Sequence, residues 1–471
     1  MSQPVTAKTV YAYALPEGTK PLAIFSSLYR FPYTQFLDST APDQQGGRYS
    51  TVLFQPVEIL EVWGDKVTVT NRDQQLSLRG KLTDLLAERL DVWGQGEVMT
   101  DPTLPPFQGG AVGYFGFGFG HVKQRITDIP QAAFGIYDQC VSFDHAEGRA
   151  WYVVVSDSEE QARNKYNHFA RLSSRSFLPA EDSVQPHLSW APRVLPGPLK
   201  ENVRRLTDYI HSGSFDRTFL CQYYEGDIPA GYDVLAHYQS LRQENKTPLG
   251  ACLMLGGLNV MVADAEPVFT VNNKQIEVYH ISNRTPRPEG SLRDHVAAQE
   301  LANDQAVMDA HHRLAKDQAI RLSSLCRANG ILGPSTPEVI ETGHEYQIGS
   351  ITRGVLNEKT TLADLLDSFT PAAIHSSTPL DRTLRVVSEM EHLTRGPAYG
   401  HTAVIGFNGH MTISLNTETV VNNGNELRFT TGLPVNANTE PDIWYDELVD
   451  QAEAALNRIG SDTEQRKASM G

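Results

Sequence analysis

The sequence predicts an α+β fold in which strands and helices form separate layers. Short runs rich in β-branched and aromatic residues occur in both halves of the chain, and helical patterns are grouped between them. A doubly wound fold would instead need strands and helices in regular alternation. The 471 residues, 40% of them hydrophobic, suffice for a sizeable core, either in two or three domains or in one large domain.

Strands dominate the first part of the chain. Runs bounded by Gly, Pro and Asp predict strands over residues 48–53, 57–62, 66–70 and 150–155. Apolar residues spaced three and four apart predict helices over 82–92 and 159–172. The glycine-rich run 109–120 lacks the following helix of a dinucleotide-binding loop, because Pro130 comes soon after it. This run therefore predicts close backbone packing within a sheet.

Residues 178–198 contain five prolines and no clear period, which predicts a linker or a long surface loop. Beyond this segment, strands are expected over 219–224, 250–255, 268–271, 275–281, 410–421 and 426–431, with a turn at 422–425. Helices are expected over 199–212, 292–329, 362–368, 381–393 and 441–458.

Charge and cysteine content exclude several classes of protein. Lys and Arg number 40 against 56 Asp and Glu, so the formal net charge is −16 and nucleic-acid binding is not expected. The four cysteines are far apart and form no CxxC pair, which predicts reduced thiols in a cytoplasmic protein. The chain shows no signal-peptide pattern and no run of about 18 apolar residues, so no membrane segment is expected.

Two histidine motifs lack the spacing that a known chemistry requires. His311 and His312 are neighbours in a predicted helix, so they point about 100° apart and cannot bind one metal ion together. Exposed or capping histidines are the expected interpretation. His375, Ser376 and Ser377 are consecutive, and no G-x-S-x-G turn is present, so this segment is expected to be a polar loop.

Longer blocks occur in a characteristic order along almost the whole chain. They are FLDS (36–39), GGRYS (46–50), FQGGAVGYFGF (107–117), YIHSGSFDRTFLCQ (209–222), NKTPLGACL (245–253), VADAEP (262–267), ISNRTPRPEG (281–290), TPAAIHSSTP (370–379), TRGPAYGHTAVIGF (394–407) and EPDIWYDE (440–447). In this order they resemble the chorismate-utilising enzymes, which include anthranilate synthase component I, aminodeoxychorismate synthase, and the isochorismate and salicylate synthases.

The resemblance implies a fold and a division of the chain. The family fold is one α+β unit of two large, mostly antiparallel sheets that enclose the active site, with helices outside. It would span residues 1–471, as an N-terminal sheet region (1–177), the Pro-rich segment (178–198) and a chorismate-binding-like region (199–471). Asp38 and Ser39 match the segment that senses tryptophan in anthranilate synthases, and a folding role for Ser39 is the alternative.

The positions that bind magnesium in the family are changed. The first metal-binding Glu of the family matches Ala310, and the second matches Trp444. A shift of one residue would offer Asp309 at the first position. Magnesium prefers an octahedron of hard oxygen atoms, which neither a methyl group nor an indole provides. The comparison with the family pattern therefore implies that the metal site is lost, and no cofactor is expected.

The positions that bind the carboxylates of chorismate are also changed. Glu418 stands at a family Arg position, and Gln451 stands at a family Lys position. In the segment that holds Gly432 and Asn436, Pro434 removes a backbone donor. A dianion such as chorismate is therefore expected to bind poorly.

Other positions keep polar groups that suit a small-molecule site. Glu266 matches the general acid or base of the family, and His311 is expected to assist it, because histidine titrates near neutral pH. Arg217 is suited to orient an anionic or carbonyl group, although it is too basic to act as a base. Arg395 is expected to be structural. The expected substrate-binding residues are Arg217, Tyr399, Asn416, Glu418, Gly432, Asn436 and Gln451.

Three functions are compatible with this pattern. The first is a divergent enzyme with lyase- or transferase-like chemistry that works without magnesium on a neutral or amine-bearing small molecule, in specialised-metabolite biosynthesis. The second is a catalytically inactive homologue that binds a ligand or a partner. The third is a magnesium-dependent anthranilate or aminodeoxychorismate synthase. It would need free ammonia or a glutamine amidotransferase subunit, because no glutaminase is fused to the chain. A homodimer is compatible with each function.

Overall fold

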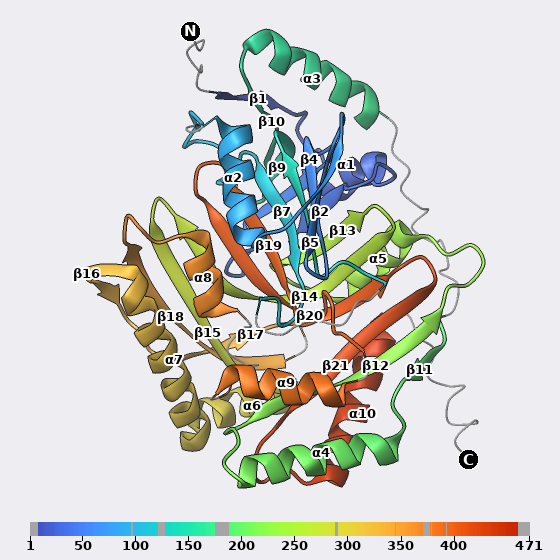
Figure 1. Ribbon diagram of the computed structural model, residues 1–471, viewed down its shortest axis with the longest axis vertical. Coiled ribbons are helices and arrows are strands. Elements are labelled where there is room, and N and C mark those ends of the chain that lie inside the picture. Colours follow the sequence, from blue (N-terminus) through green and yellow to red (C-terminus); the bar gives the residue numbers. More distant parts are fainter. Residues whose placement is uncertain are drawn as a thin grey trace.

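The computed structural model of the chain describes residues 8–95, 98–120, 128–174, 188–287, 291–343, 345–370, 377, 379–391 and 393–459. Within these ranges the chain forms 21 strands and ten helices, and the predicted α+β fold is confirmed. Figure 1 shows the strands running through the middle of the molecule, with the helices on its outside.

The N-terminal part lies at the top of Figure 1. Its strands are β1 (Thr9–Ala14), β2 (Gln35–Asp38), β3 (Tyr49–Leu53), β4 (Glu58–Trp63), β5 (Lys66–Asn71), β6 (Gln75–Leu78), β7 (Gly110–Phe115), β8 (Ala132–Tyr137), β9 (Gln139–Asp144) and β10 (Arg149–Ser156). Its helices are α1 (Pro21–Leu28), α2 (Leu82–Gly94) and α3 (Glu159–Ser173).

The C-terminal part supplies the remaining elements. Its strands are β11 (Trp190–Pro192), β12 (Thr218–Asp227), β13 (Gly250–Leu255), β14 (Leu258–Asn272), β15 (Gln275–Pro286), β16 (Cys326–Leu332), β17 (Glu338–Glu341), β18 (Glu345–Leu356), β19 (His401–Gly406), β20 (Met411–Asn422) and β21 (Glu426–Val435). Its helices are α4 (Pro196–His211), α5 (Val234–Glu244), α6 (Ser291–Asn303), α7 (Gln305–Leu325), α8 (Leu362–Phe369), α9 (Leu380–Met390) and α10 (Pro441–Arg458).

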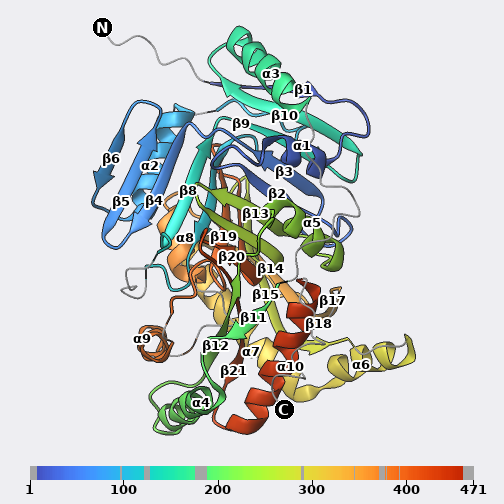
Figure 2. The ribbon, with the colours of Figure 1, turned by 90° about the vertical axis from the view of Figure 1, so that its right-hand side faces the viewer.

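The strands form one antiparallel hydrogen-bonded network. Two ladders join the N-terminal strands to the C-terminal ones. In one of them β2 pairs with β13, and in the other β7 pairs with β19. The long ladder between β14 and β20 runs through the centre of the molecule (Figures 1 and 2). At one side of Figure 2, β4, β5 and β6 stand beside α2.

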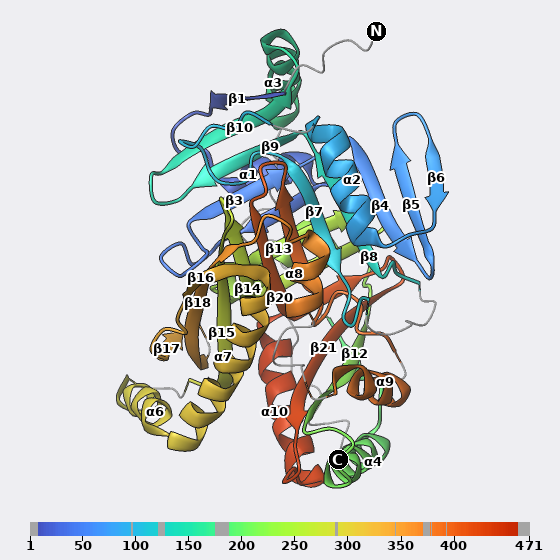
Figure 3. The same ribbon diagram turned by 60° about the vertical axis from the view of Figure 1, so that its left-hand side comes forward.

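Apolar helix faces cover this network from outside. α7 lies along β15 and β18 (Figure 3), where Leu322 belongs to a buried cluster with Phe269 of β14 and Phe369 of α8. A second cluster packs α1 and α3 on the N-terminal strands through Phe25 and Phe169. α3 and α8 thus bury the apolar faces that their sequence periodicity predicted, whereas α1 was not predicted.

Most elements expected from periodicity are confirmed. β13 and α10 coincide with their predicted ranges, and β3, β4 and β5 lie within one residue of theirs. The glycine-rich run forms β7 as expected. A Cβ at Gly113 would overlap with the carbonyl oxygen of Ala133 on β8, which explains why this strand needs glycine.

The single helix expected over residues 292–329 is wrong. The chain forms α6 and then stops at Asp304, whose carboxylate caps α7 by accepting hydrogen bonds from the N–H groups of Ala306 (2.9 Å) and Val307 (3.1 Å). α7 ends at Leu325, and the following residues form β16, where Cys326 pairs with Leu356 of β18. Local periodicity could not predict this strand, because its pairing partner lies far along the chain.

Part of the segment expected to be a linker forms regular structure. Residues 175–187 lie outside the described residues. Residues Trp190–Pro192, however, form β11 against β12, and α4 begins at Pro196. Proline suits the first turn of a helix because its φ is already helical and its missing N–H has no partner there.

A buried ion pair holds β12 in place. The side chains of Glu391 and Arg395 are 5% and 1% exposed, and their charged atoms lie 2.6 Å apart. Glu391 also accepts hydrogen bonds from the N–H of Cys221 and the hydroxyl of Tyr223, both at 3.0 Å. Arg395 donates to the carbonyl of Phe219 at 2.7 Å. These contacts agree with the structural role expected for Arg395.

We predict that Glu391→Gln lowers the free energy of unfolding by about 3–5 kcal/mol, because it leaves the Arg395 guanidinium buried without its counter-charge. Urea unfolding followed by circular dichroism measures this change. The matched control is Glu159→Gln, which breaks a Glu–Arg pair of helical spacing with Arg163 whose side chains are 69% and 61% exposed. The control should lose less than about 1 kcal/mol. Equal losses in the two variants would contradict the prediction.

Candidate active site

A cavity of about 330 Å³ lies between β14, β15, β17 and β18, and it is also lined by the loops at residues 44–45, 246–248 and 335–336 and by Thr342. It opens on the face of β18 that is turned away from α7. On the α7 face, the hydroxyl of Ser350 contacts the ring of His311. Gln347, Gly349 and Ile351 lie at odd spacings from Ser350, so their side-chain positions are on the cavity face.

Glu266 is the expected site residue that lines this cavity. It is only 7% exposed. The β14–β20 register shifts on both sides of it, between Asp264 and Ala265 and between Pro267 and Phe269. Pro267 has no N–H to give to the ladder, and bulges of this kind redirect side chains beside active sites. The local sequence thus places a carboxylate in the cavity instead of in a flat sheet.

Gln347 is a residue of the site that the sequence did not reveal. Its Nε2 donates to Oε1 of Glu266 at 3.4 Å and to Oε1 of Glu345 at 3.1 Å. It is 3% exposed, so the amide has a fixed place between the two carboxylates. A glutamine inside a strand gives no signal by itself, and only the pairing of β18 with β15 brings it to Glu266.

A second cavity, of about 420 Å³, adjoins the first. The two share the lining residues Gln45, Pro248, Pro267 and Tyr279. Burial raises the pKa of Tyr279 to about 12, so its hydroxyl stays protonated at neutral pH. The second cavity reaches Asp38, whose carboxylate already accepts hydrogen bonds from Arg242 (2.7 Å) and Tyr238 (3.2 Å).

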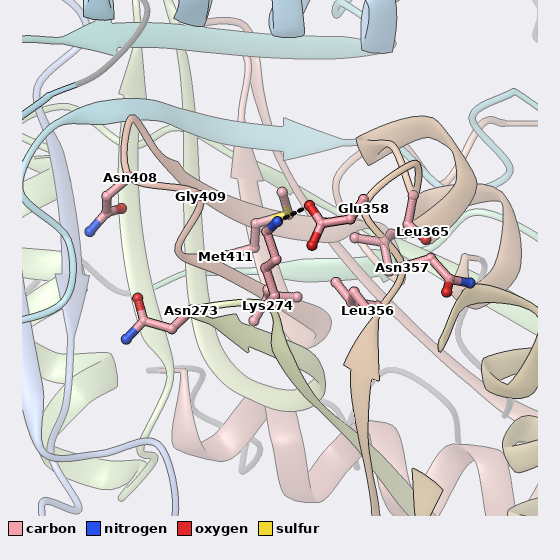
Figure 4. Close-up of a pocket in the computed structure, with 11 residues that line it drawn as sticks. Asn273, Lys274, Leu356, Asn357, Glu358, Leu365, Asn408, Gly409 and Met411 are labelled. Atoms are coloured by element: carbon pink, nitrogen blue, oxygen red, sulfur yellow. Dashed lines mark hydrogen bonds and ion pairs between the residues drawn. The ribbon is translucent and has the colours of Figure 1, made fainter. Parts of the chain in front are cut away.

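A third cavity, also of about 420 Å³, lies at the turn between β14 and β15 and near the start of α8 (Figure 4). Its charged lining residues are Lys274 and Glu358, which form an ion pair with each other. Asn408 and Gly409 border it from the turn after β19. None of the expected site residues lines it, so we assign it no role in catalysis.

His311 is fully buried, so the expectation that it is exposed or capping is wrong. Its Nδ1 and Nε2 each lie 2.8 Å from a hydroxyl, of Ser282 and Ser350 respectively. Burial lowers its pKa to about 4, with smaller contributions from His280 and His312. Both ring nitrogens are therefore engaged between α7 and the sheet; His311 itself does not line the cavity, but its partner Ser350 is one of the lining residues.

Asn416 of β20 holds the turn that contains Tyr399. Asn416 is fully buried, accepts a hydrogen bond from the hydroxyl of Thr402 at 2.8 Å and donates to the carbonyl of Pro397 at 3.1 Å. Tyr399 has a positive φ of 55°, donates its N–H to the carbonyl of Asn416 at 2.8 Å, and packs its ring on Phe219. The polar groups of Asn416 thus hold the turn before β19.

Glu418, Gly432 and Gln451 meet where β20, β21 and α10 come together. Glu418 forms an ion pair with Arg458 of α10. Gln451 donates to the hydroxyl of Thr431 at 2.7 Å and to the carbonyl of Gly432 at 3.4 Å. A Cβ at Gly432 would overlap with the carbonyl of Leu220, so this glycine permits the close approach of β21 to β12. The side chains at the family cation positions therefore contact the protein itself.

The remaining expected residues lie apart from the cavity. Asn436 is exposed and its side chain accepts the N–H of Asn438 at 2.8 Å, which forms the turn before α10. Arg217 is exposed at the start of β12. His375 and Ser376 lie outside the described residues, and Ser377 is buried at 6% exposure.

The two family metal positions do not fit magnesium. Ala310 offers no ligand atom, and the neighbouring Asp309 is exposed and accepts a hydrogen bond from Gln305 at 2.8 Å. Trp444 is 3% exposed in an apolar cluster between α4 and α10, and its indole N–H donates to Pro434 at 3.1 Å. Among the residues that the structure describes, no three His, Cys, Asp or Glu side chains are grouped to hold a metal ion.

The changed family positions lie in a fold that known enzymes share. A family model described as chorismate binding enzyme matches residues 35–457. The chain belongs to this family. The predicted resemblance is confirmed, and the family position of Glu266 falls within the matched range.

Curated relatives and solved structures agree with this assignment. The chain is 23% identical to anthranilate synthase component 1 of Acetivibrio thermocellus, over 97% of this chain and 95% of the relative. It is 23% identical to aminodeoxychorismate synthase component 1 of Escherichia coli, over 92% and 95%. Anthranilate synthase component I from Streptococcus pneumoniae superposes with a TM-score of 0.76 at 19% identity, covering 87% of this chain and 92% of that one.

The menaquinone-specific isochorismate synthase from Escherichia coli superposes with a TM-score of 0.72 at 15% identity, covering 97% of this chain and 96% of that one. At these identities the structural likeness shows the fold, and the expected anthranilate synthase component I-like fold is confirmed. No helix in the described part of this family member is long and apolar enough to cross a membrane.

We predict that the free energy of unfolding falls as the pH is lowered from about 6.5 to 4. Burial lowers the pKa of His237 and His311 to about 4 and that of His401 to about 3, whereas unfolded histidine titrates near 6.5. The unfolded chain therefore binds more protons in this window, so acid favours unfolding. Urea unfolding at several pH values measures the slope.

His311→Gln should reduce this slope by about 1.4 kcal/mol per pH unit, because one proton-binding group is removed. His312→Gln is the matched control, since His312 is the exposed neighbour on the same helix. An unchanged slope for His311→Gln would mean that His311 carries a proton in the folded state.

Proposed function

We propose that this chain is an enzyme on the chorismate-utilising scaffold that works without magnesium and takes a small neutral or amine-bearing molecule in place of chorismate. One observation carries the proposal. Side chains at the family metal and carboxylate-binding positions are bonded within the protein: Trp444 in an apolar cluster, Glu418 to Arg458, and Gln451 to Thr431.

Charge supports this choice of substrate. The family holds a dianion with two cations and a magnesium ion, and at the matching positions this chain has a carboxylate, an amide, an alanine and an indole. The guanidinium of Arg458 is neutralised by its ion pair with Glu418. Two carboxylates entering the site would lose their hydration without gaining counter-charges, which costs several kcal/mol in a partly buried site.

Glu266 supplies the acid/base chemistry of the proposed enzyme. Its carboxylate lines a cavity, is nearly buried, and accepts a hydrogen bond from Gln347. A carboxylate held in this way can take a proton from a bound molecule and return it to another atom. This chemistry needs no ammonia, so the proposed enzyme works without a glutamine amidotransferase subunit. Its setting would be specialised-metabolite biosynthesis.

A ligand-binding protein without turnover is the second candidate. Buried polar groups need partners, and a ligand would be required if the protein supplied none. His311, Asn416 and Gln451 find their partners within the protein. These residues therefore do not require a substrate, which removes one argument for catalysis and leaves Glu266 in its cavity as the main support for an enzyme.

We predict no turnover of chorismate or isochorismate with or without magnesium and ammonia, and no thermal stabilisation that depends on magnesium. The reason is the missing set of cations and metal ligands. Differential scanning fluorimetry detects binding, and mass spectrometry detects release of pyruvate. Magnesium-dependent stabilisation together with pyruvate release would instead identify a genuine anthranilate or aminodeoxychorismate synthase.

We predict that Glu418→Gln increases the affinity for chorismate about three- to tenfold, because it leaves the positive charge of Arg458 without its carboxylate. The concentration dependence of the thermal shift gives the apparent Kd. Arg458→Gln is the matched control and should weaken binding. An unchanged Kd in both variants would place this ion pair outside the ligand site.

A further inference from the structure

We propose that the outer edge of β6 is a docking surface for a second copy of this chain, and that two β6 strands pair antiparallel about a two-fold axis at Leu76. The inference is independent of the proposed function, because β6 contributes no residue to the cavity beside Glu266.

β6 is the outermost strand of the group that β4, β5 and β6 form beside α2 (Figures 2 and 3). Among the described strands, β5 is the one with which it pairs. Gln75, Leu76 and Ser77 are exposed, Leu76 at 42%. Native proteins commonly protect such an edge with a lysine, a proline or a bulge, and the strand QLSL has none of these. The edge of β6 is therefore open to another strand.

The hydrogen-bond pattern of the β5–β6 hairpin fixes which groups of β6 point outward. The N–H of Asn71 donates to the carbonyl of Gln74 at 3.0 Å, so these two residues close the hairpin as a hydrogen-bonded pair. Hydrogen-bonded pairs alternate with other pairs along an antiparallel ladder, and Leu76 therefore bonds to β5. The N–H and C=O groups of Gln75 and Ser77 then face away from β5, at the outer edge.

A two-fold axis at Leu76 uses all of these outward groups. Gln75 of each copy lies opposite Ser77 of the other, and each of these pairs exchanges N–H···O bonds in both directions. The two Leu76 side chains meet at the axis in a non-hydrogen-bonded pair, where the Cα atoms are about 4.5 Å apart and the side chains are close. The pairing thus buries the exposed leucine of both copies.

The charges that flank β6 are complementary in this register. Asp73 lies three residues before the axis and Arg79 three residues after it, so each Asp73 comes opposite the Arg79 of the other copy. Both residues are exposed. Arg79 approaches Asp65 of its own chain at 3.8 Å, but these side chains are 80% and 75% exposed, so the contact is weak. Opposite charges directly across two strands stabilise their pairing, which favours a second copy as the occupant of this edge.

The first test is the mass of the full chain in solution, at an ionic strength of about 0.15 M. Sedimentation velocity or light scattering should show the mass rising from 52.2 kDa toward twice that value, with an apparent Kd on the order of 10–100 μM, because the interface is small. An unchanged mass from about 1 to 500 μM, a range that brackets this Kd, would overturn the inference.

Charge reversal tests the contact between Asp73 and Arg79. Asp73→Arg and Arg79→Asp should each raise the Kd at least about tenfold, because like charges then meet at both ends of the strand pair. The double variant restores opposite charges and should return the Kd to within about threefold of the wild-type value. A double variant that stays as weak as the single ones would contradict the register.

Lys81→Asp is the matched control for Arg79→Asp. Lys81 is exposed, and its replacement changes the charge by the same amount, but it lies beyond the paired residues. The control should leave the Kd within about twofold of the wild-type value. A loss equal to that of Arg79→Asp would mean that overall charge governs association, and would also count against the inference. Thermal melts establish that each variant is folded.

Leu76→Cys tests the position of the axis. All four native cysteines are buried, so the introduced thiol is the exposed one. Across the axis its Cα atoms would be about 4.5 Å apart, a separation that a disulfide can bridge. Mild oxidation should therefore link two copies, which a non-reducing gel detects. Gln74→Cys is the control, because its two copies would lie about 14 Å apart and should link at least about tenfold more slowly. Equal rates of linkage would overturn the pairing at Leu76.

Discussion

The antiparallel pairing of β14 with β20 is the constraint on which the rest of the structure depends. β14 continues into β15 and β20 into β21, and through β19 and β13 the same ladder carries the N-terminal strands. Its register is irregular only near Asp264, Glu266 and Pro267. Regular pairing elsewhere fixes the strand register. The irregular positions change the direction in which the side chains near Glu266 point. The pairing of β14 with β20 thus both holds the sheet together and sets the position of the buried Glu266 carboxylate.

The sequence predicted the fold well because fold depends on periodicity and on block order. The β-branched runs, the glycine pattern of β7 and the proline at the start of α10 are all local signals. The sequence did not predict the break at Asp304, because an Asp within a helical pattern can either cap a new helix or face solvent. Its residue type does not distinguish the two. β16 was missed because it forms only through its pairing with β18.

The candidate site was harder to predict, because its members are brought together by tertiary structure. Glu266 could be found from its place in a motif. Gln347 could not, since no spacing in the sequence relates it to Glu266, and its role follows from strand pairing alone. His311 was expected beside Glu266 because both carry suitable chemistry. The structure gives both its ring nitrogens serine partners beneath α7, a burial that residue type cannot reveal.

These placements limit the proton chemistry that the cavity supports. Tyr279 keeps its proton at neutral pH because its pKa is raised to about 12, and His311 stays neutral on the other face of β18. Among the described lining residues, Glu266 is the carboxylate that is both nearly buried and held by an amide. A reaction at this site would then use one carboxylate to take a proton and to return it. The cavity lining also includes Asp264, His280 and Glu338, so a second titratable group lies close to Glu266.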